Sequence, residues 1–448
     1  MSDANSCAVT RLPDEWLVVK LADVATKIQD GTHFSPHSTS GPFRYLTSKN
    51  VRFGKMDISD CGWISEQEHR GIYARCEVRF GDVLLTKDGA NTGNAALNSL
   101  NEPFSLLSSV AIIRTDDEIA HSPFILQYLL SPQGQQRLKD LMSGNAITRL
   151  TLEKIKDFTI PLPPVKQQRK IALILTTMDN LIEKTESLIA KYQAIKQGMM
   201  HDLFTRGVDA HGHLRPPQAE VPDLYKQSEL GWIPKEWEIN RVGDYLDRIE
   251  QGWSPDCDTE PASAGEWGVL KTTAVVWDGF ECRENKRLPA RLPPIPQYEV
   301  HVDDVLMTRG GPNSRVGVVA IVRETRDKLM LSDKLYRLIP KKNLQPAYLA
   351  LALSSERTQT HLSTLKTGLA ESQTNISQQI VRRLWIGVPS PEEQRRTCER
   401  IDAIEKVQHT QRRSLSEFRV LKTGLMQDLL TGRVRVKVDE AEEVVAHV

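Results

Sequence analysis

Two polar loops that contain glycine stand at matching places in the sequence and carry residue types that bind DNA. The first begins at Lys87 and the second at Arg309, each directly after an apolar segment (GDVLLT and DDVLMT). Glycines in both loops allow a ligand to approach the backbone closely. Cationic, amide and hydroxyl side chains suit phosphate oxygens and base edges. The candidate DNA-binding residues of these loops are Lys87, Asn91, Thr92, Arg309, Asn313, Ser314 and Arg315.

Earlier loops in each half have a similar composition. The segment QDGTHF (29–34) and a following Lys-Asn pair have counterparts in QGWS (251–254) and a following Lys-Thr-Thr run. Any one of these loops could be an ordinary turn exposed to solvent, but their duplication at matched positions favours binding. The candidates added from these loops are Thr32, His33, Lys49, Asn50, Lys271 and Thr272.

The loops are duplicated because almost the whole chain is duplicated. The segments 165–207 and 392–432 repeat each other, with a constant offset of 226 and no gap from Pro163/Pro389 to Thr205/Thr431. The openings LPDEW and IPKEW stand 221 residues apart, and GDVLLT and DDVLMT stand 222 apart. Insertions are therefore confined to the globular parts, and each half is one globular domain followed by one helical segment.

Both copies of the helical segment should be long helices that pair with each other. Neither contains a proline in its interior, and Gly207 and Gly432 follow them as terminators. At about 1.5 Å per residue, such a helix is roughly 58 Å long and cannot lie inside one small core. The second copy is more polar at mid-length, so its seam is looser there or contacts a partner. The seam expected on the first copy is Ile171, Ile174, Met178, Leu181, Leu188, Tyr192, Ile195 and Met199.

Short β-branched segments punctuated by turn residues indicate that each domain mixes strands with a few helices. The predicted fold class is α+β, with two pseudo-symmetric halves. The segment between the halves is polar and rich in proline, which predicts an extended linker. The predicted boundaries are 12–163 for the first domain, 164–206 for its helix, 207–231 for the linker, 232–389 for the second domain, 390–432 for its helix and 433–448 for a tail.

Composition limits the function classes. The 448 residues suit two to four domains, and no window approaches a membrane span, so a cytoplasmic protein without a membrane partner is expected. The formal net charge is zero, so DNA binding must use local basic patches or a partner's charge. Six scattered cysteines without a CxxC pair argue against a zinc ribbon or a disulfide framework and indicate reduced thiols.

The sequence lacks the common motifs of a catalyst. It contains no phosphate-binding P-loop, no G-x-G-x-x-G after a strand, no G-x-S-x-G elbow and no Asn/Asp-Pro-Pro-aromatic motif. We therefore predict no catalytic residues, no metal site and no cofactor in this chain. Two alternatives stay open, which are an autonomous DNA-modifying enzyme with an unrecognised site and a coiled-coil scaffold that does not read DNA.

These features together resemble the specificity (S) subunits of type I restriction-modification systems. The resemblance spans residues 12–432 and rests on the paired P-x-E-W openings, the two GDVLLT-like segments, the proline-rich approaches IPLPP and VPSPEEQRR, and the repeated helices that end in GLMQDLLTG or its like. No single motif decides the matter, but their order and duplication are specific.

The resemblance implies a function for each part. Each globular domain would be a target recognition domain that reads one half of a bipartite, asymmetric double-stranded DNA sequence. The two helices would pack as an antiparallel coiled coil that spaces the domains and docks two modification (methyltransferase) subunits. Those partners would bind S-adenosylmethionine, and restriction subunits that use ATP would join them. This chain itself would not be an enzyme.

Overall fold

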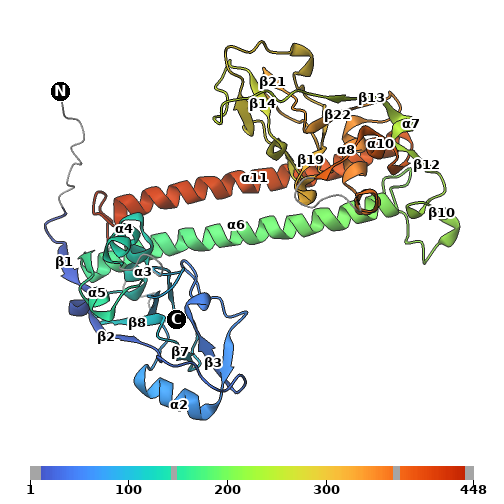
Figure 1. Cartoon of the computed structure of the whole chain (residues 1–448). Coiled ribbons are helices and arrows are strands. Elements are labelled where there is room, and N and C mark those ends of the chain that lie inside the picture. The colour runs from blue at the N-terminus through green and yellow to red at the C-terminus, as the bar shows by residue number, and fades with distance from the viewer. Residues whose placement is uncertain (1–11, 143–148, 367–373, 439–448) are drawn as a thin grey trace. The chain divides into compact units, whose positions relative to one another are not determined.

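The computed structural model of the chain describes residues 12–142, 149–366 and 374–438. It divides the chain into two compact units, one drawn from Met1–Ser187 with Arg413–Val448 and the other from Leu188–Arg412. Each unit holds one globular domain and part of each of two long helices (Figure 1).

The first unit is built on a four-stranded antiparallel sheet in the order β2-β8-β5-β6. The sequences VAIIRT of β8 and VLLT of β5 are aliphatic and β-branched, which explains why these strands are central and buried. Asp30 and Leu85 both lie opposite Ala111, so β2 and β5 end at the edge of the sheet where β8 begins. The strands are β2 (Ala25–Asp30), β8 (Val110–Thr115), β5 (Val83–Thr86) and β6 (Ala95–Leu97).

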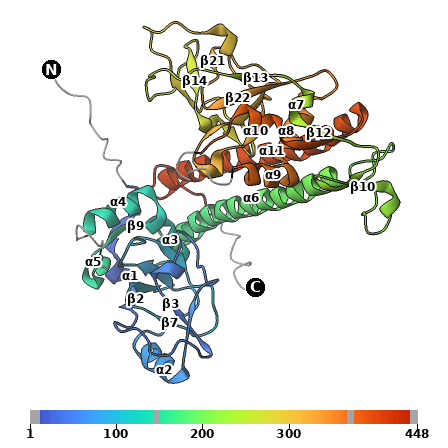
Figure 2. The same cartoon turned by 45° about the vertical axis from the view of Figure 1, so that its right-hand side comes forward.

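Smaller elements complete the first domain. The apolar face of α3 packs in the same core as β5 and β8, through residues such as Phe124 and Leu129. Figure 2 shows α2 beside the part of the domain that carries β3 and β7. The elements are β1 (Leu17–Lys20), α1 (Leu21–Val24), β3 (Phe43–Leu46), η1 (Ser48–Asn50), β4 (Gly62–Ile64), α2 (Glu66–Arg75), β7 (Ser105–Leu106), α3 (Ser122–Leu130), α4 (Pro132–Leu141), α5 (Leu152–Lys156) and β9 (Thr159–Leu162).

The second unit repeats this architecture. Its main sheet has the order β13-β22-β18-β20, its smaller sheet the order β17-β14-β21, and β12 pairs with β24 as β1 pairs with β9. The predicted α+β fold with two pseudo-symmetric halves is confirmed. The matching elements are β12 (Glu238–Arg241), α7 (Val242–Tyr245), β13 (Leu246–Gln251), β14 (Gly268–Leu270), β17 (Asn285–Arg287), β18 (Val305–Thr308), β20 (Val319–Ile321), β21 (Leu329–Met330), β22 (Leu335–Pro340), α8 (Pro346–Ser354), α9 (Glu356–Leu365), α10 (Gln378–Arg382) and β24 (Trp385–Val388).

Further short elements complete the second unit. Two of these strand pairs, β15-β16 and β19-β23, occupy places where the first unit has the isolated bridges Val51–Met56 and Asp88–Arg149. They are η2 (Pro222–Leu224), β10 (Tyr225–Ser228), β11 (Gly231–Pro234), η3 (Thr272–Ala274), β15 (Val275–Val276), β16 (Gly279–Phe280), η4 (Pro296–Tyr298), β19 (Gly310–Gly311), η5 (Asn313–Arg315) and β23 (Thr374–Asn375).

The two long helices, α6 (Val165–Thr205) and α11 (Pro391–Leu429), run antiparallel in each unit. In the first unit Asp179 pairs with Lys422, and Glu186 lies 2.6 Å from Arg419. The second unit has Gln193 hydrogen-bonded to Gln408 at 3.0 Å, and Lys196 paired with Glu405 at 2.7 Å. Within each unit, a higher residue number on α6 meets a lower one on α11, which is the signature of antiparallel pairing.

The seam between these helices differs in part from the predicted one. Leu181 and Ile195 were expected in it, but they are 38% and 41% exposed. Thr185 and Lys196 are buried instead, at 6% and 8% exposed. A helix repeats every 3.6 residues, so a strict three-and-four spacing drifts off the contact face over several turns. Gln408 is only 1% exposed, so the seam around it is polar but closed.

Each helix begins at a junction with its own domain, and the two junctions use different chemistry. In the first unit, the Trp16 ring nitrogen donates to Gln167 Oε1 at 3.2 Å. In the second unit, the position that matches Gln167 is Glu393, which accepts from the Trp237 ring nitrogen at 3.1 Å. Arg215 also donates to Glu393 at 2.6 and 2.9 Å, and only 7% of this arginine is exposed.

The segment 207–231 is anchored to the second unit at a few buried residues, while its other residues are half-buried or exposed. The buried residues are Gly207, Val208, Arg215 and Tyr225. The buried carboxylate of Glu393 needs a cation, and the segment supplies Arg215, while the Val208 backbone N–H donates to Glu393 at 2.8 Å. Burial alone would lower the pKa of Arg215, but the hydrogen bonds and negative charge of Glu393 raise it overall. Gly207, with φ +64, is the predicted terminator of α6 and lies against this cluster.

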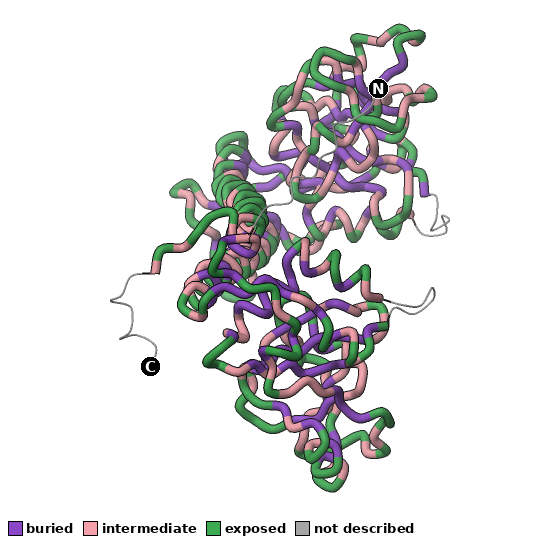
Figure 3. The backbone as a smooth tube through the Cα atoms, turned by 90° about the vertical axis from the view of Figure 1, so that its left-hand side faces the viewer, coloured by how far each residue is buried: buried purple, intermediate pink, exposed green. Residues whose placement is uncertain are grey.

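Buried residues follow the sheets, whereas exposed residues lie in the connecting loops and along the outer faces of the long helices (Figure 3). The five described cysteines are free thiols, and burial raises the pKa of Cys76 to about 11 and of Cys398 to about 12. Cys7 and the tail beyond residue 438 lie outside the described residues. Among the helices that the structure describes, none is long and apolar enough to cross a membrane.

Candidate nucleic-acid interface

Four segments meet where β2 and β5 end, and we call this region the first edge (residues 30–34, 48–50, 87–94 and 107–109). The Ser48 backbone N–H donates to Ser109 Oγ at 3.2 Å, and the Asn91 amide donates to the Ser48 carbonyl at 3.4 Å. Thr32 exchanges backbone hydrogen bonds with Leu106 and Ser108 at 2.8 and 2.7 Å. The structure thus brings together loops that lie far apart in the sequence and that the sequence analysis had selected one by one.

Lys87 lies under the first edge and has its charge neutralised there. Only 2% of the residue is exposed, and its ammonium lies 2.7 Å from Asp88 and 3.5 Å from Asp30. Asp88 also pairs with Arg149 at 3.1 Å, and Asp30 with Arg75 at 3.3 Å. In this arrangement the ammonium of Lys87 is held by two carboxylates of its own domain, and its contact with DNA stays a prediction.

Three other predicted residues hold the loops in place. Asn50 is 2% exposed, and its side chain donates to the carbonyls of Asp57 and Asp60 and accepts from the Thr47 N–H. Thr32 is 2% exposed, and Thr92 donates to the Gly89 carbonyl at 2.6 Å. Asn50 and Thr32 have their side chains hydrogen-bonded within the domain, and their direct contact with DNA stays a prediction.

Lys49 and His33 are the freely accessible candidates of the first edge. Each side chain is 52% exposed. Lys49 pairs with Asp60 at 3.0 Å, and the His33 ring lies 3.5 Å from Asp30. A surface ion pair of this kind contributes little stability, so Lys49 can exchange Asp60 for a phosphate at small cost.

The equivalent region of the second domain is the second edge (residues 251–254, 271–275, 309–317, 332–334 and 374–376). The Asp333 backbone N–H donates to Ser254 Oγ at 3.2 Å, and the Ile376 N–H donates to the Arg309 carbonyl at 2.9 Å. Gly310 pairs with Asn375 in the short ladder of β19 and β23. The predicted loops of the second domain therefore also converge.

Arg309 sits at this edge without a carboxylate partner among the described residues. Its guanidinium lies over the Tyr336 ring, 5.4 Å from the ring centroid, and one Nη donates to the Asp333 carbonyl at 3.3 Å. Its Nε is enclosed and has no hydrogen-bond partner among the described groups. Stacking and the carbonyl contact orient the guanidinium plane while leaving its positive charge available.

Arg315 belongs to the second edge and links two of its segments by hydrogen bonds. One Nη donates to the carbonyls of Thr272 and Val275 at 3.2 and 3.4 Å, which ties η5 to η3. Lys271 stands 3.9 Å from Glu284. Asn313 and Ser314 are exposed on η5, as a side chain that reads DNA has to be.

Sequence reasoning missed several residues of these edges. Asp30 and Asp333 were not selected, because only the strand register places them beside Lys87 and Arg309. Two exposed aromatic residues were also missed: Phe53 is 53% exposed and Trp277 is 49% exposed. Each occupies a matching tight turn a few residues beyond η1 or η3, and an aromatic residue at the same place in both repeats was a readable signal.

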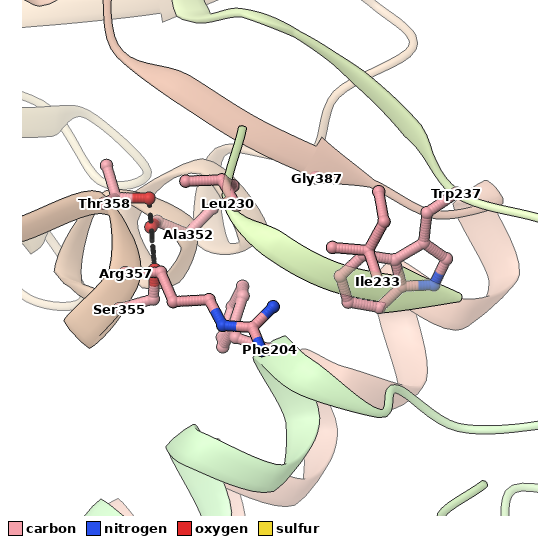
Figure 4. Close-up of a pocket in the computed structure, with 9 residues that line it drawn as sticks. All are labelled: Phe204, Leu230, Ile233, Trp237, Ala352, Ser355, Arg357, Thr358 and Gly387. Carbon is pink, nitrogen blue, oxygen red and sulfur yellow. Dashed lines mark hydrogen bonds between the residues drawn. The ribbon is translucent and has the colours of Figure 1, made fainter. Parts of the chain in front are cut away.

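A small cavity of the second unit is lined by residues outside the second edge. Figure 4 shows its lining, in which Ile233 lies beside the Trp237 ring and the Arg357 side chain extends toward Phe204. Its volume is about 10 Å³, which is room for one water molecule. Burial lowers the pKa of Arg357, whose Nη donates to the Trp232 carbonyl at 2.6 Å.

No three His, Cys, Asp or Glu side chains gather as a metal site among the residues that the structure describes.

Fold and edges together define a class: a tandem-repeat protein in which two equivalent α+β domains stand on paired antiparallel helices. The sequence matches the family described as Type I restriction modification DNA specificity domain over residues 13–192 and 234–416. The match covers most of the chain, so the chain belongs to this family, and the resemblance drawn from the sequence motifs is confirmed.

Individual relatives agree with this assignment. The type I restriction enzyme EcoEI specificity subunit of Escherichia coli is 42% identical over 193 residues, which are 43% of this chain and 32% of that relative. The MjaVIII specificity subunit of Methanocaldococcus jannaschii is 26% identical over 438 residues, covering 95% of both chains. The crystal structure of the type I restriction-modification S subunit from M. genitalium shares the fold, with a TM-score of 0.61 at 14% identity over 94% of this chain and 96% of that one.

Proposed function

We propose that this chain supplies the DNA-sequence specificity of a type I restriction-modification complex, with each domain reading one half of a bipartite double-stranded target. The observation that carries the proposal is the duplicated edge. Each of two equivalent sheets gathers polar loops at the place where its strands end, and those loops expose groups such as Lys49 in one domain and Asn313 in the other.

The exposed groups have the chemistry that DNA requires. Lys49 and His33 on the first edge suit phosphate oxygens or base acceptors. Asn313 and Ser314 on the second edge can donate and accept, and an amide side chain can pair with adenine. Because the net charge of the chain is zero, affinity rests on these local groups and on positive charge that partner subunits bring.

The long helices are the proposed docking surface for two modification subunits. In the first unit, Leu173 on α6 and Val420 and Leu421 on α11 are 60%, 72% and 52% exposed. Exposed aliphatic residues on a helix that already buries another face support a protein partner. On this proposal the chain is not itself an enzyme and works in the cytoplasm, S-adenosylmethionine and ATP bind to the partners, and restriction subunits complete the assembly.

The proposal is tested by assembling the chain with its modification subunits and mapping methylated adenines in genomic DNA. We expect one asymmetric motif with two defined halves and a fixed gap. Replacing residues 12–163 with the matching domain of a relative should change one half and leave the other. Methylation that follows no bipartite motif, or that is unchanged when this chain is omitted, contradicts the proposal.

A further inference from the structure

The two domains place a cation at the same point of the same fold. Leu85 lies opposite Ala111 on β8, and Lys87 follows two residues later. Met307 lies opposite Tyr336 on β22, and Arg309 follows two residues later. Lys87 and Arg309 are therefore equivalent positions, and any difference between them comes from their neighbours.

The neighbours differ in charge. Lys87 is flanked by the carboxylates of Asp30 and Asp88. The last residue of β13, which matches Asp30, is Gln251, and the residue after Arg309 is Gly310. Neither carboxylate has a counterpart at the matching position, and Arg309 forms no ion pair among the described residues. The carboxylate that the second edge does contain, Asp333, lies 3.7 Å from Lys334.

The second edge also holds several enclosed polar atoms without a partner. They include Arg309 Nε, Arg315 Nε, Ser332 Oγ and Asp333 Oδ1. Ser332 is only 3% exposed. Enclosed polar groups are nearly always hydrogen-bonded, as the Asn50 side chain is in the first edge, so donors and acceptors left unpaired at the second edge indicate a ligand that supplies the missing partners.

We propose that Arg309, together with Asp333, reads a G·C base pair in the second half-site, whereas Lys87 is a structural lysine that reads nothing. This inference rests on the proposed function and adds an asymmetry to it. The major-groove edge of a G·C pair offers two acceptors on guanine and one amino donor on cytosine. The guanidinium of Arg309 would donate to the two guanine acceptors, and the carboxylate of Asp333 would accept from the cytosine amino group. Tyr336 and the Asp333 carbonyl hold the guanidinium plane in advance.

The first test substitutes the two equivalent cations in the complete complex with its modification subunits. Methylation rates are measured on duplexes that carry every base pair at each position of the target. For Arg309→Ala we expect a loss of about tenfold to a hundredfold in discrimination at one G·C position of the second half-site, with the first half-site unchanged. For Lys87→Gln we expect a lower unfolding midpoint but unchanged discrimination in both half-sites.

A second test supplies the missing carboxylate. Gly310→Asp places an acid where Asp88 stands in the first domain, and it should reproduce the loss caused by Arg309→Ala. Gly310→Asn is the matched control, because both side chains meet the same Asn375 Oδ1, which would lie 2.4 Å from a new Cβ. Only the charge differs between them, so Gly310→Asn should keep most of the discrimination.

The outcomes separate this inference from the function on which it rests. If the unaltered complex shows no bipartite motif, the proposed function itself fails. If it shows one but Arg309→Ala weakens methylation equally on all sequences, Arg309 contacts phosphate and the base-reading role is overturned. If Lys87→Gln relaxes the first half-site as Arg309→Ala relaxes the second, the asymmetry is overturned.

Discussion

The two helix junctions show how one scaffold accommodates two chemistries. Gln167 and Glu393 hold the same position near the start of α6 and α11, and both accept a hydrogen bond from a tryptophan ring. The neutral amide of Gln167 needs no charged partner. The carboxylate is 6% exposed and requires a cation, which Arg215 supplies from the segment between the halves. The acid thus ties the connecting segment to the second junction through Val208 and Arg215.

Removing the cation should have the largest effect. Arg215→Ala leaves Glu393 buried without its charge partner, and breaking such a pair costs about 3–5 kcal/mol of unfolding free energy. The measurement is urea unfolding followed by tryptophan fluorescence, with hydrogen exchange of the Val208 amide as a local probe. The double variant Arg215→Met with Glu393→Gln removes both charges and should recover much of the loss. Equal losses in the single and double variants would show that the ion pair does not matter.

Adding a side chain to Gly207, in the same junction, should have the second largest effect. Gly207 has φ +64, and a Cβ there would lie 2.2 Å from Glu393 Oε1 and 2.7 Å from the Trp237 ring. We expect Gly207→Ala to cost about 2–4 kcal/mol, from backbone strain and the displaced carboxylate. Gly212→Ala is the control, since φ is +84 with open space around the new methyl group. It should show the strain of about 1 kcal/mol alone, and similar losses at the two positions would contradict the steric part of the argument.

Adding an acid to the neutral junction should have a smaller effect. Gln167→Glu keeps the acceptor for the Trp16 ring but introduces a charge where the structure describes no counterpart to Arg215. We expect a loss of about 1 kcal/mol, because the site is only partly enclosed and water solvates the new charge. The urea midpoint of the first unit is the readout. An unchanged midpoint would show that the first junction already tolerates an acid.

The smallest effect is expected in the helix seam of the second unit. Gln408 donates to Gln193 at 3.0 Å inside the seam. Replacing both by Leu exchanges one hydrogen bond for apolar contact, and the unfolding free energy should change by about 1 kcal/mol or less. Replacing Gln408 alone leaves the half-buried Gln193 without its partner in the seam and should cost more than the double change. The reverse order would show that the pair does not act as a unit.

The sequence was sufficient for the architecture because the repeat is visible without any structure. The constant offset between 165–207 and 392–432 predicts two helices, and the glycines that follow them end both helices through positive φ. The seam was harder to predict. Leu181 is 38% exposed although it is apolar, and Lys196 is only 8% exposed although it carries a charge. A lysine can be buried when Glu405 stands opposite, and that pairing depends on the helix register.

The edges were predictable as loops but not as arrangements of charge. Lys87 and Arg309 look alike in sequence, each a cation after a strand. Asp30 lies 57 residues before Lys87 in the chain, and only the pairing of β2 and β5 with β8 brings the two together. Sequence composition can therefore select a loop for DNA binding, whereas strand register decides which of its cations stays available.

The division of the chain into units also sets an order for folding. The second unit is one continuous stretch, Leu188–Arg412, whereas the first needs both Met1–Ser187 and Arg413–Val448. Met426, Leu429 and Leu430 belong to the first unit's core, alongside residues such as Ile171 on α6. During synthesis the second unit can close before Met426, Leu429 and Leu430 leave the ribosome, although it begins later in the chain. The first domain begins first but is completed only after the second unit, because part of its core is translated after that unit.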